Sequence, residues 1–166
     1  MGINHKILLD TAETVANEFC AKIAPWCEKY MVVGSVRRGS AWVHDIDIVM
    51  IPKPRGALDI VLWAKQQKDG TRVIKMGRSG MQLLFQGIQI DLYLATEESW
   101  WTLVVIRTGS KDHNIQLCLR AQSRQLKLHA DGRGLFNRYD QEISVDSEEQ
   151  FFERLALAYK APEERG

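Results

Sequence analysis

The amino-acid sequence predicts an α+β fold, in which a mixed sheet with flanking helices forms a larger α/β body and a small α+β lobe follows it. Three observations support this prediction. Short apolar runs typical of strands are concentrated between residues 27 and 95, segments with helical periodicity lie on either side of them, and a Thr-Gly-Ser junction at 108–110 precedes a stretch of different charge. The 166 residues are enough for a domain with a sizeable core.

Periodicity and turn residues predict the individual elements. Apolar residues at helical spacing predict a helix over 7–24 that Pro25 ends, and "GALDIVLWAKQQ" and "EESWWTLVVIR" have similar spacing. Strands are expected at "YMVVGS", "DIDIVMIP", "TRVIKM", "MQLLFQ" and "IQIDLYLA", the last two joined around Gly87. Beyond the junction we expect a helix over 111–125, a small hairpin over 126–137 and a helix over 144–159 with a Ser147/Gln150 capping box.

Composition excludes some classes of protein. The apolar fraction of 45% and the charged fraction of 26% are ordinary for a globular protein, and no apolar run approaches the ~20 residues of a membrane span. The start of the chain does not resemble a signal peptide, and three cysteines without CxxC spacing favour a reducing compartment. We therefore expect a cytoplasmic protein, or one located wherever its partner is, with no membrane association.

The charge is unevenly distributed along the chain. The formal net charge is only +1, but residues 101–140 carry a net +4 and residues 141–166 a net −4. A local cationic segment mildly favours a nucleic-acid partner, although a solvated helix face is the commoner explanation when such a segment is considered alone.

The stretch "GSVRRGS" combines a hydroxyl with guanidinium groups at a turn. Ser35 follows a predicted strand and begins one or two helical turns, where converging backbone N–H groups form an anion site. Arg38 lies three residues further and shares a helix face with Ser35, whereas Arg37 points elsewhere and fits a structural ion pair. The arrangement suits a phosphate chain. Taken alone, an ordinary capped turn with exposed arginines would explain it better.

Three aspartates occupy apolar strand sequence. Asp45 and Asp47 point to one face of their strand, about 7 Å apart, and Asp91 lies in a second apolar strand. Carboxylates in such positions need partners or cations, and oxygen ligands suit Mg²⁺ or Mn²⁺. Two such ions can activate a hydroxyl and stabilise a leaving phosphate. Beside a phosphate-binding turn, the set indicates phosphoryl or nucleotidyl transfer; the structural alternative is a strand pair joined by buried Asp–Arg salt bridges.

The same residues resemble the nucleotidyltransferase superfamily, whose pattern is Gly-Ser, then Asp-x-Asp, then a third Asp on a neighbouring strand. The stretches "GSVRRGS…DIDIV", "IQIDLYLA", "TGSKDHN", "LRA", "GLF" and "EEQFFERLALAYKAPEER" resemble, in this order, the palm and C-terminal subdomain of family X DNA polymerases. The resemblance covers nearly the whole chain. It implies a nucleotidyltransferase-fold palm over 1–105 and a nucleotide- and DNA-binding subdomain over 106–166.

The resemblance also implies roles for individual residues. Asp45, Asp47 and Asp91 would be the catalytic residues and would bind two Mg²⁺ or Mn²⁺ ions, with Asp91 helping to deprotonate the primer 3′-hydroxyl. Other positions would bind the incoming dNTP or the DNA. The nucleotide-binding positions are Gly34, Ser35, Arg38, the backbone of His44, Gly109 and Ser110 around an unusual tight peptide, and Asn114, and the DNA-binding positions are Lys111, Arg120 and Arg124.

The layout is similar to that of the small two-domain viral members of the family. About thirty residues precede the Gly-Ser, so we expect neither an N-terminal lyase domain nor a helix-hairpin-helix domain. The expected protein is a monomeric, template-directed DNA polymerase that fills short gaps during DNA repair. In place of the usual aromatic pair before Thr-Gly-Ser, the chain has Ile106 and Arg107, so we expect ribonucleotides to be incorporated more readily than by relatives with that pair.

Two alternatives remain open at the level of the sequence. A small template-independent nucleotidyltransferase acting on a small molecule, a protein or an RNA end would share the three aspartates, but it would not need the "TGSKDHN" helix. A non-catalytic module that binds DNA ends or a partner is disfavoured, because the intact carboxylates carry an electrostatic cost.

Overall fold

A mixed five-stranded sheet forms the body of the protein. The structure is a computed structural model, and it describes residues 6–166. The strands are β1 (Ile7–Leu8), β2 (Cys27–Val32), β3 (Trp42–Val43), β4 (Ile46–Pro52), β5 (Arg72–Gly77), β6 (Gly80–Phe85), β7 (Ile88–Leu94), β8 (Lys127–Leu128) and β9 (Leu135–Phe136). The helices are α1 (Leu9–Ile23), α2 (Gly34–Arg37), α3 (Gly56–Gln66), α4 (Trp100–Thr108), α5 (Lys111–Ser123) and α6 (Glu148–Arg154), with 3₁₀ turns η1 (Ala24–Trp26) and η2 (Pro162–Arg165).

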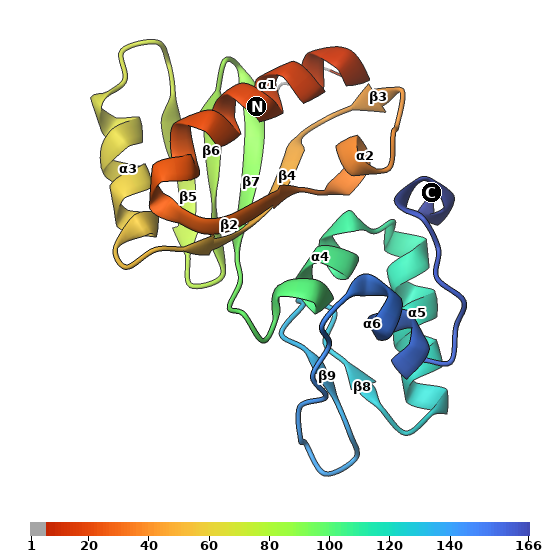
Figure 1. The fold of residues 1–166 in the computed structure, drawn as a ribbon. Coiled ribbons are helices and arrows are strands. Elements are labelled where there is room, and N and C mark those ends of the chain that lie inside the picture. Colours follow the sequence, from red (N-terminus) through yellow and green to blue (C-terminus); the bar gives the residue numbers. More distant parts are fainter. Residues whose placement is uncertain (1–5) are drawn as a thin grey trace.

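The order of strands in the sheet is β2-β4-β7-β6-β5 (Figure 1). The central neighbours β4 and β7 are parallel, and the other three pairs are antiparallel. The prediction of a mixed sheet with flanking helices is therefore confirmed. Because β4 and β7 run in the same direction, the first residues of the two strands lie at the same end of the sheet, and Asp47 is paired with Asp91 there.

The two faces of the sheet have different coverings. Alternate residues of β4, namely Ile46, Ile48 and Met50, are fully buried in the core formed with α1 and α3. On the opposite face, Val49 and Ile51 belong to a separate buried cluster that includes residues of α4. The alternation follows from the period of two along a strand. Only the segment of β4 that contains half-buried Asp47 is left partly open on the α4 side.

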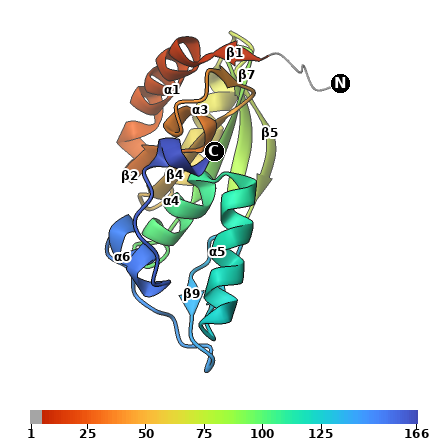
Figure 2. The same cartoon turned by 90° about the vertical axis from the view of Figure 1, so that its right-hand side faces the viewer.

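The C-terminal lobe has a core of its own. Phe151 and Phe152 of α6 pack with residues of α4, α5, β8 and β9. The turned view in Figure 2 shows α5 running beside this hairpin, while the C-terminal end returns toward the upper part of the molecule. There the backbone N–H of Ser110 donates to the carbonyl of Arg165 at 2.9 Å. No helix within residues 6–166 is long and apolar enough to cross a lipid bilayer.

Some elements differ in extent from the prediction. Residues 7 and 8 pair with Trp42 and Val43 as a two-stranded sheet instead of starting the first helix. The last predicted helix, over 144–159, is limited to Glu148–Arg154, because the chain turns at Ala156, where φ is +51°. Its predicted N-cap is confirmed, since the Ser147 hydroxyl accepts from the N–H of Gln150 at 3.0 Å.

Candidate active site

Parallel pairing of β4 and β7 brings two of the predicted carboxylates together. Asp47 and Asp91 are partners in the register of the two strands, so their side chains extend from the same face of the sheet. Asp45 lies two residues before Asp47, immediately ahead of β4. All three side chains are half-buried. Residues separated by 44 positions in the sequence are thereby placed on adjacent strands, as the sequence pattern predicted.

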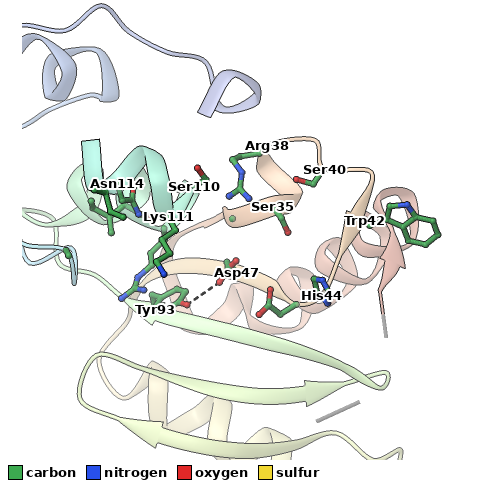
Figure 3. Close-up of a pocket in the computed structure, with 17 residues that line it drawn as sticks. Ser35, Arg38, Ser40, Trp42, His44, Asp47, Tyr93, Ser110, Lys111 and Asn114 are labelled. Carbon is green, nitrogen blue, oxygen red and sulfur yellow. Dashed lines mark hydrogen bonds between the residues drawn. The ribbon is translucent and has the colours of Figure 1, made fainter. Parts of the chain in front are cut away.

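The carboxylate of Asp47 is held in an environment that disfavours its charge. Burial, followed by repulsion from Asp45 and Asp91, raises the pKa of Asp47 to about 7, against the opposing effects of Tyr93 and Arg107. The Tyr93 hydroxyl donates to Asp47 Oδ1 at 3.2 Å (Figure 3), and the Arg107 guanidinium lies 4.0 Å from the centre of the Tyr93 ring. Accumulated negative charge of this kind is stabilised when a cation binds.

Asp91 is in a related environment. Burial raises its pKa, although a hydrogen bond from the Gln89 amide to Asp91 Oδ1 at 2.9 Å acts in the opposite direction. A carboxylate with a raised pKa is a better proton acceptor than an ordinary one at neutral pH. The position of Asp91 on β7 therefore suits a general base.

The three aspartates suit Mg²⁺ or Mn²⁺ chemically, because carboxylate oxygens are the ligands that these ions prefer. They lie on or immediately ahead of the adjacent strands β4 and β7. Gly34 provides room for one of them: a Cβ at this residue would lie 2.0 Å from Asp47 Oδ2. In the present conformation, however, no three His, Cys, Asp or Glu side chains within residues 6–166 are gathered closely enough to hold a metal ion. Asp47 instead accepts from Tyr93, and Asp91 from Gln89.

The Gly-Ser turn precedes these carboxylates in the chain and lies beside them in space. Gly34 has a φ of +63°, a conformation that favours glycine, and it begins the single helical turn α2. Ser35 and Arg38 line the same cavity, and Arg38 Nη1 donates to the carbonyl of Thr108 at 2.5 Å. This contact links the turn to the end of α4 and holds the Arg38 guanidinium near the cavity.

The neighbouring arginine has a different role, as its helical position predicted. Arg37 forms a two-point ion pair with Glu148, with N–O distances of 2.9 and 2.7 Å, and Nη1 also donates to the Thr108 hydroxyl. Glu148 in turn binds Arg165, whose side chain is fully buried, at 2.9 Å. The expected structural ion pair of Arg37 is therefore confirmed, and it joins α2 to the C-terminal lobe.

The Thr-Gly-Ser junction makes a sharp turn between α4 and α5. The Gly109–Ser110 peptide is cis, and Gly109 has a φ of +72°. The Ser110 hydroxyl caps α5 by accepting from the N–H of His113 at 3.4 Å. A Cβ on Gly109 would approach Arg38 Nη1 to 3.1 Å, so a glycine allows this turn and the Gly-Ser turn to lie close together.

One cavity of about 620 Å³ collects most of the predicted residues (Figure 3). Its lining includes the predicted residues Gly34, Ser35, Arg38, His44, Asp45, Asp47, Gly109, Ser110, Lys111 and Asn114. Asp91 lines an adjoining cavity of about 220 Å³, and Tyr93 and Arg107 border both cavities. Arg120 and Arg124 line neither of them.

The side chains predicted to read the base or the DNA have mixed environments. Asn114 donates from Nδ2 to the carbonyl of Ile106 at 2.7 Å, and its buried Oδ1 has no hydrogen-bond partner among residues 6–166. Arg120 is bound to the carbonyls of Leu155 and Ala156 at 2.9 and 3.1 Å. Lys111 and Arg124 are exposed. The contacts of Arg120 are those of a structural residue, and its predicted role at the DNA stays a prediction.

Tyr93, Arg107 and Trp42 belong to the site although the sequence reasoning did not select them as site residues. Tyr93 had a detectable signal, because it lies two residues after Asp91 and so shares its strand face. The only sequence signal of Arg107 is its place in the pair before Thr-Gly-Ser, which concerns sugar discrimination. Trp42 lies three residues before Asp45 and lines the large cavity. Nothing in its local sequence distinguishes it from a surface tryptophan.

Comparisons with known proteins agree with this geometry. The family model described as the DNA polymerase beta thumb matches residues 103–166. Two proteins called Repair DNA polymerase X, from a warthog isolate and a tick isolate of African swine fever virus, are 26% and 25% identical to the chain over 167 aligned positions. Each alignment covers 96% of this chain and 95% of the viral protein.

The same fold occurs in solved structures of polymerase beta from Leishmania infantum. A ternary primer–template complex matches with a TM-score of 0.83 at 21% identity, covering 99% of this chain and 78% of the other. A ternary gap complex matches with a TM-score of 0.84 at 19% identity, covering 99% and 72%. The fold is therefore that of polymerase beta. The thumb family model is thus similar to the C-terminal part of this chain, and the two viral repair polymerases are similar to nearly its whole length.

Proposed function

We propose that the protein is a template-directed DNA polymerase that fills short gaps during DNA repair. The observation that carries the proposal is the register of β4 and β7, which places Asp47 beside Asp91 at the edge of the cavity that the Gly-Ser turn and the Thr-Gly-Ser turn both line. The viral relatives are called repair polymerases, and one of the similar structures is a gap complex, which supports the same function.

In the proposed reaction, the primer 3′-hydroxyl oxygen attacks the α-phosphorus of the dNTP, and the bond from that phosphorus to the leaving pyrophosphate breaks. Asp45, Asp47 and Asp91 would hold two Mg²⁺ or Mn²⁺ ions, which supply charge stabilisation and activation of the hydroxyl. Asp91 would accept the proton of the 3′-hydroxyl, and its place beside Asp47 in the register of β4 and β7 supports this role.

The remaining cavity residues position the nucleotide. Ser35, Arg38 and the backbone of His44 bind the β- and γ-phosphates, because they present donors on one side of the cavity. Gly109 and Ser110 lie below the sugar, and both residues line the cavity. Most of the catalytic effect in such transfers comes from positioning and electrostatics.

Asn114 is proposed to contact the base of the bound nucleotide. Its buried Oδ1 lacks a partner in the described part of the chain and is available to accept from a ligand. Lys111, at the exposed start of α5, and Arg124, at its end, are proposed to bind DNA phosphates together with Arg120. For Arg120 this requires a free guanidinium nitrogen, because two others already donate to carbonyls.

We further propose that the palm comprises residues 1–105 and the DNA-binding subdomain residues 106–166, and that the protein acts as a monomer wherever its DNA is located. A separate hydrophobic cluster that begins at Val105 supports this boundary. Residues 1–5 are outside the described structure.

Ile106 is buried yet lines the nucleotide cavity. The hypothesis of relaxed sugar discrimination predicts comparable kinetics with dATP and ATP, and a strong preference for dATP would contradict it.

Primer extension on nicked, gapped and single-stranded DNA tests the proposed function. Each nucleotide is offered singly with Mg²⁺ or Mn²⁺. We expect addition of the template-matched nucleotide, and loss of that addition in Asp45→Asn, Asp47→Asn and Asp91→Asn. Addition without regard to the template would favour the template-independent nucleotidyltransferase. Substantial activity of Asp91→Asn would remove this residue from the mechanism. No extension together with no Mn²⁺ binding would favour a non-catalytic module.

A further inference from the structure

The nucleotide cavity extends past the residues proposed to bind phosphates. In Figure 3, Asn114 and Lys111 lie toward one side of the cavity and Trp42 lies at the opposite side, with Ser35 and Arg38 between them. A nucleotide whose base lies near Asn114 and whose phosphates lie near Ser35 therefore points its terminal phosphate toward Trp42.

Trp42 is held at this position by a short strand pairing. In β3, Val43 is fully buried and Trp42 faces outward, as the alternation along a strand requires. Trp42 pairs in register with Leu8 of β1, and each of these two residues is 55% exposed. Among the described residues, Trp42 has no stacked aromatic ring and no cation over its face. A large indole surface is therefore available to a ligand.

We propose that Trp42, supported by Leu8, is a stacking subsite for an aromatic group carried on the terminal phosphate of the bound nucleotide. The ligand class is an esterified nucleoside polyphosphate, of which a dinucleoside polyphosphate with a second base is the natural form. This inference rests on the proposed function, because it requires phosphate binding at Ser35 and Arg38.

The chemistry of the intervening surface suits such a ligand. Ser40 and His44 line the cavity between the phosphate-binding turn and Trp42, so a phosphate chain passes polar groups before it reaches the indole (Figure 3). A base or phenyl ring gains from stacking on a tryptophan because both present flat π-surfaces. A contribution typical of base–aromatic stacking corresponds to about fivefold to a hundredfold in affinity.

Two esters of one nucleotide test the proposal without a difference in charge. Binding of the γ-phenyl ester and the γ-methyl ester of dATP is measured by isothermal titration calorimetry in Mg²⁺, with dATP and the dinucleoside tetraphosphate of deoxyadenosine in parallel. The variants are Trp42→Ala, Trp42→Phe and, as a control, Tyr30→Ala, which removes an exposed aromatic side chain of β2 that does not line the cavity.

We expect the phenyl ester to bind at least about five times more tightly than the methyl ester in the native protein. The ratio should fall to about one in Trp42→Ala and persist in Trp42→Phe and in the control Tyr30→Ala, and the control should leave the affinity for dATP unchanged. A ratio near one in the native protein, or one that survives in Trp42→Ala, overturns the subsite and leaves the polymerase proposal intact. Failure of dATP itself to bind overturns both.

Discussion

Replacement of Glu148 by alanine should destabilise the protein severely. The Glu148 carboxylate is almost fully buried and binds Arg37 of α2 and Arg165 of η2 at 2.7 and 2.9 Å. Its removal leaves the fully buried Arg165 guanidinium without its anion and breaks the link between α2 and the C-terminal lobe. The loss arises mainly from an unpaired buried charge rather than from the pair itself.

The magnitude can be worked out from this environment. Removing one partner of a buried ion pair costs about 3–5 kcal/mol. For a chain of this length, 1 kcal/mol corresponds to about 2–4 °C, so the Tm should fall by about 6–20 °C. Arg165 keeps two hydrogen bonds to the carbonyl of Lys160, which favours the lower half of that range.

Urea unfolding and thermal unfolding of Glu148→Ala and Glu149→Ala measure the effect. Glu149 is the next residue of the same helix and is exposed, so its substitution controls for helix propensity and for charge at the start of α6. We expect a change below about 0.5 kcal/mol for the control. If the two variants agree within 1 kcal/mol, the ion network does not hold the two parts of the molecule together, and the reasoning fails.

The pH dependence provides a second measurement of the same network. Burial raises the pKa of Glu148, but the hydrogen bonds and charges of Arg37 and Arg165 outweigh it and lower the pKa overall. The folded protein therefore binds this proton less readily than the unfolded chain does. The stabilisation is fully present above the ordinary glutamate pKa of about 4.3 and is lost as the pH falls below it. The stability difference between the native protein and Glu148→Gln should shrink in the same range.

Three further predictions concern the site and the lobe. Gly34→Ala places a Cβ 2.0 Å from Asp47 Oδ2 at a φ of +63°. The rate of primer extension should therefore fall by more than about a hundredfold. A change below tenfold would contradict the close approach of Gly34 to Asp47. Asp47→Asn should stabilise the metal-free protein at pH 8 by at least about 1 kcal/mol. The reason is that the pKa of Asp47 is raised to about 7, so the native folded state loses stability as the pH rises from about 4 to 7. Urea titrations measure this difference, and an advantage of the variant that does not shrink toward pH 4 would argue against the reasoning. Arg120→Gln should lower the free energy of unfolding in urea by about 1–3 kcal/mol, because its hydrogen bonds to two carbonyls are lost. The control Arg124→Gln changes an exposed residue and should not lower it. Equal stability of the two variants would show that the carbonyl contacts are weak.

Much of the body was predictable because its signals are local. The alternation around Asp47 predicted a strand with one apolar face, and Ile46 and Ile48 are indeed fully buried on the side of α1 and α3. Pro25 predicted the end of the first helix, which ends at Ile23. Helical spacing separated the two arginines correctly, since Arg37 forms the structural ion pair. Each of these signals depends on residues only a few positions apart.

Two short strands and the C-terminal end of the last helix were less predictable. The pairing of β1 with β3 involves only two residues on each strand, so its stability depends on the surrounding tertiary contacts rather than on local propensity. The last predicted helix is shorter because turning at Ala156 brings carbonyls to Arg120, a contact between residues 36 positions apart. A helical pattern that continues past the turn carries no information about that contact.

The sequence by itself determined the chemical identity of the candidate site: three carboxylates in apolar strands, a Gly-Ser turn and a Thr-Gly-Ser junction. Only the tertiary structure decided how these parts meet. The parallel register sets Asp47 beside Asp91, Tyr93 reaches Asp47 across 46 positions, and Glu148 binds Arg37 across 111. The physical reason is range, because residue type and periodicity encode the local backbone, whereas burial, pKa shifts and ion pairs depend on which distant segments the packed core brings into contact.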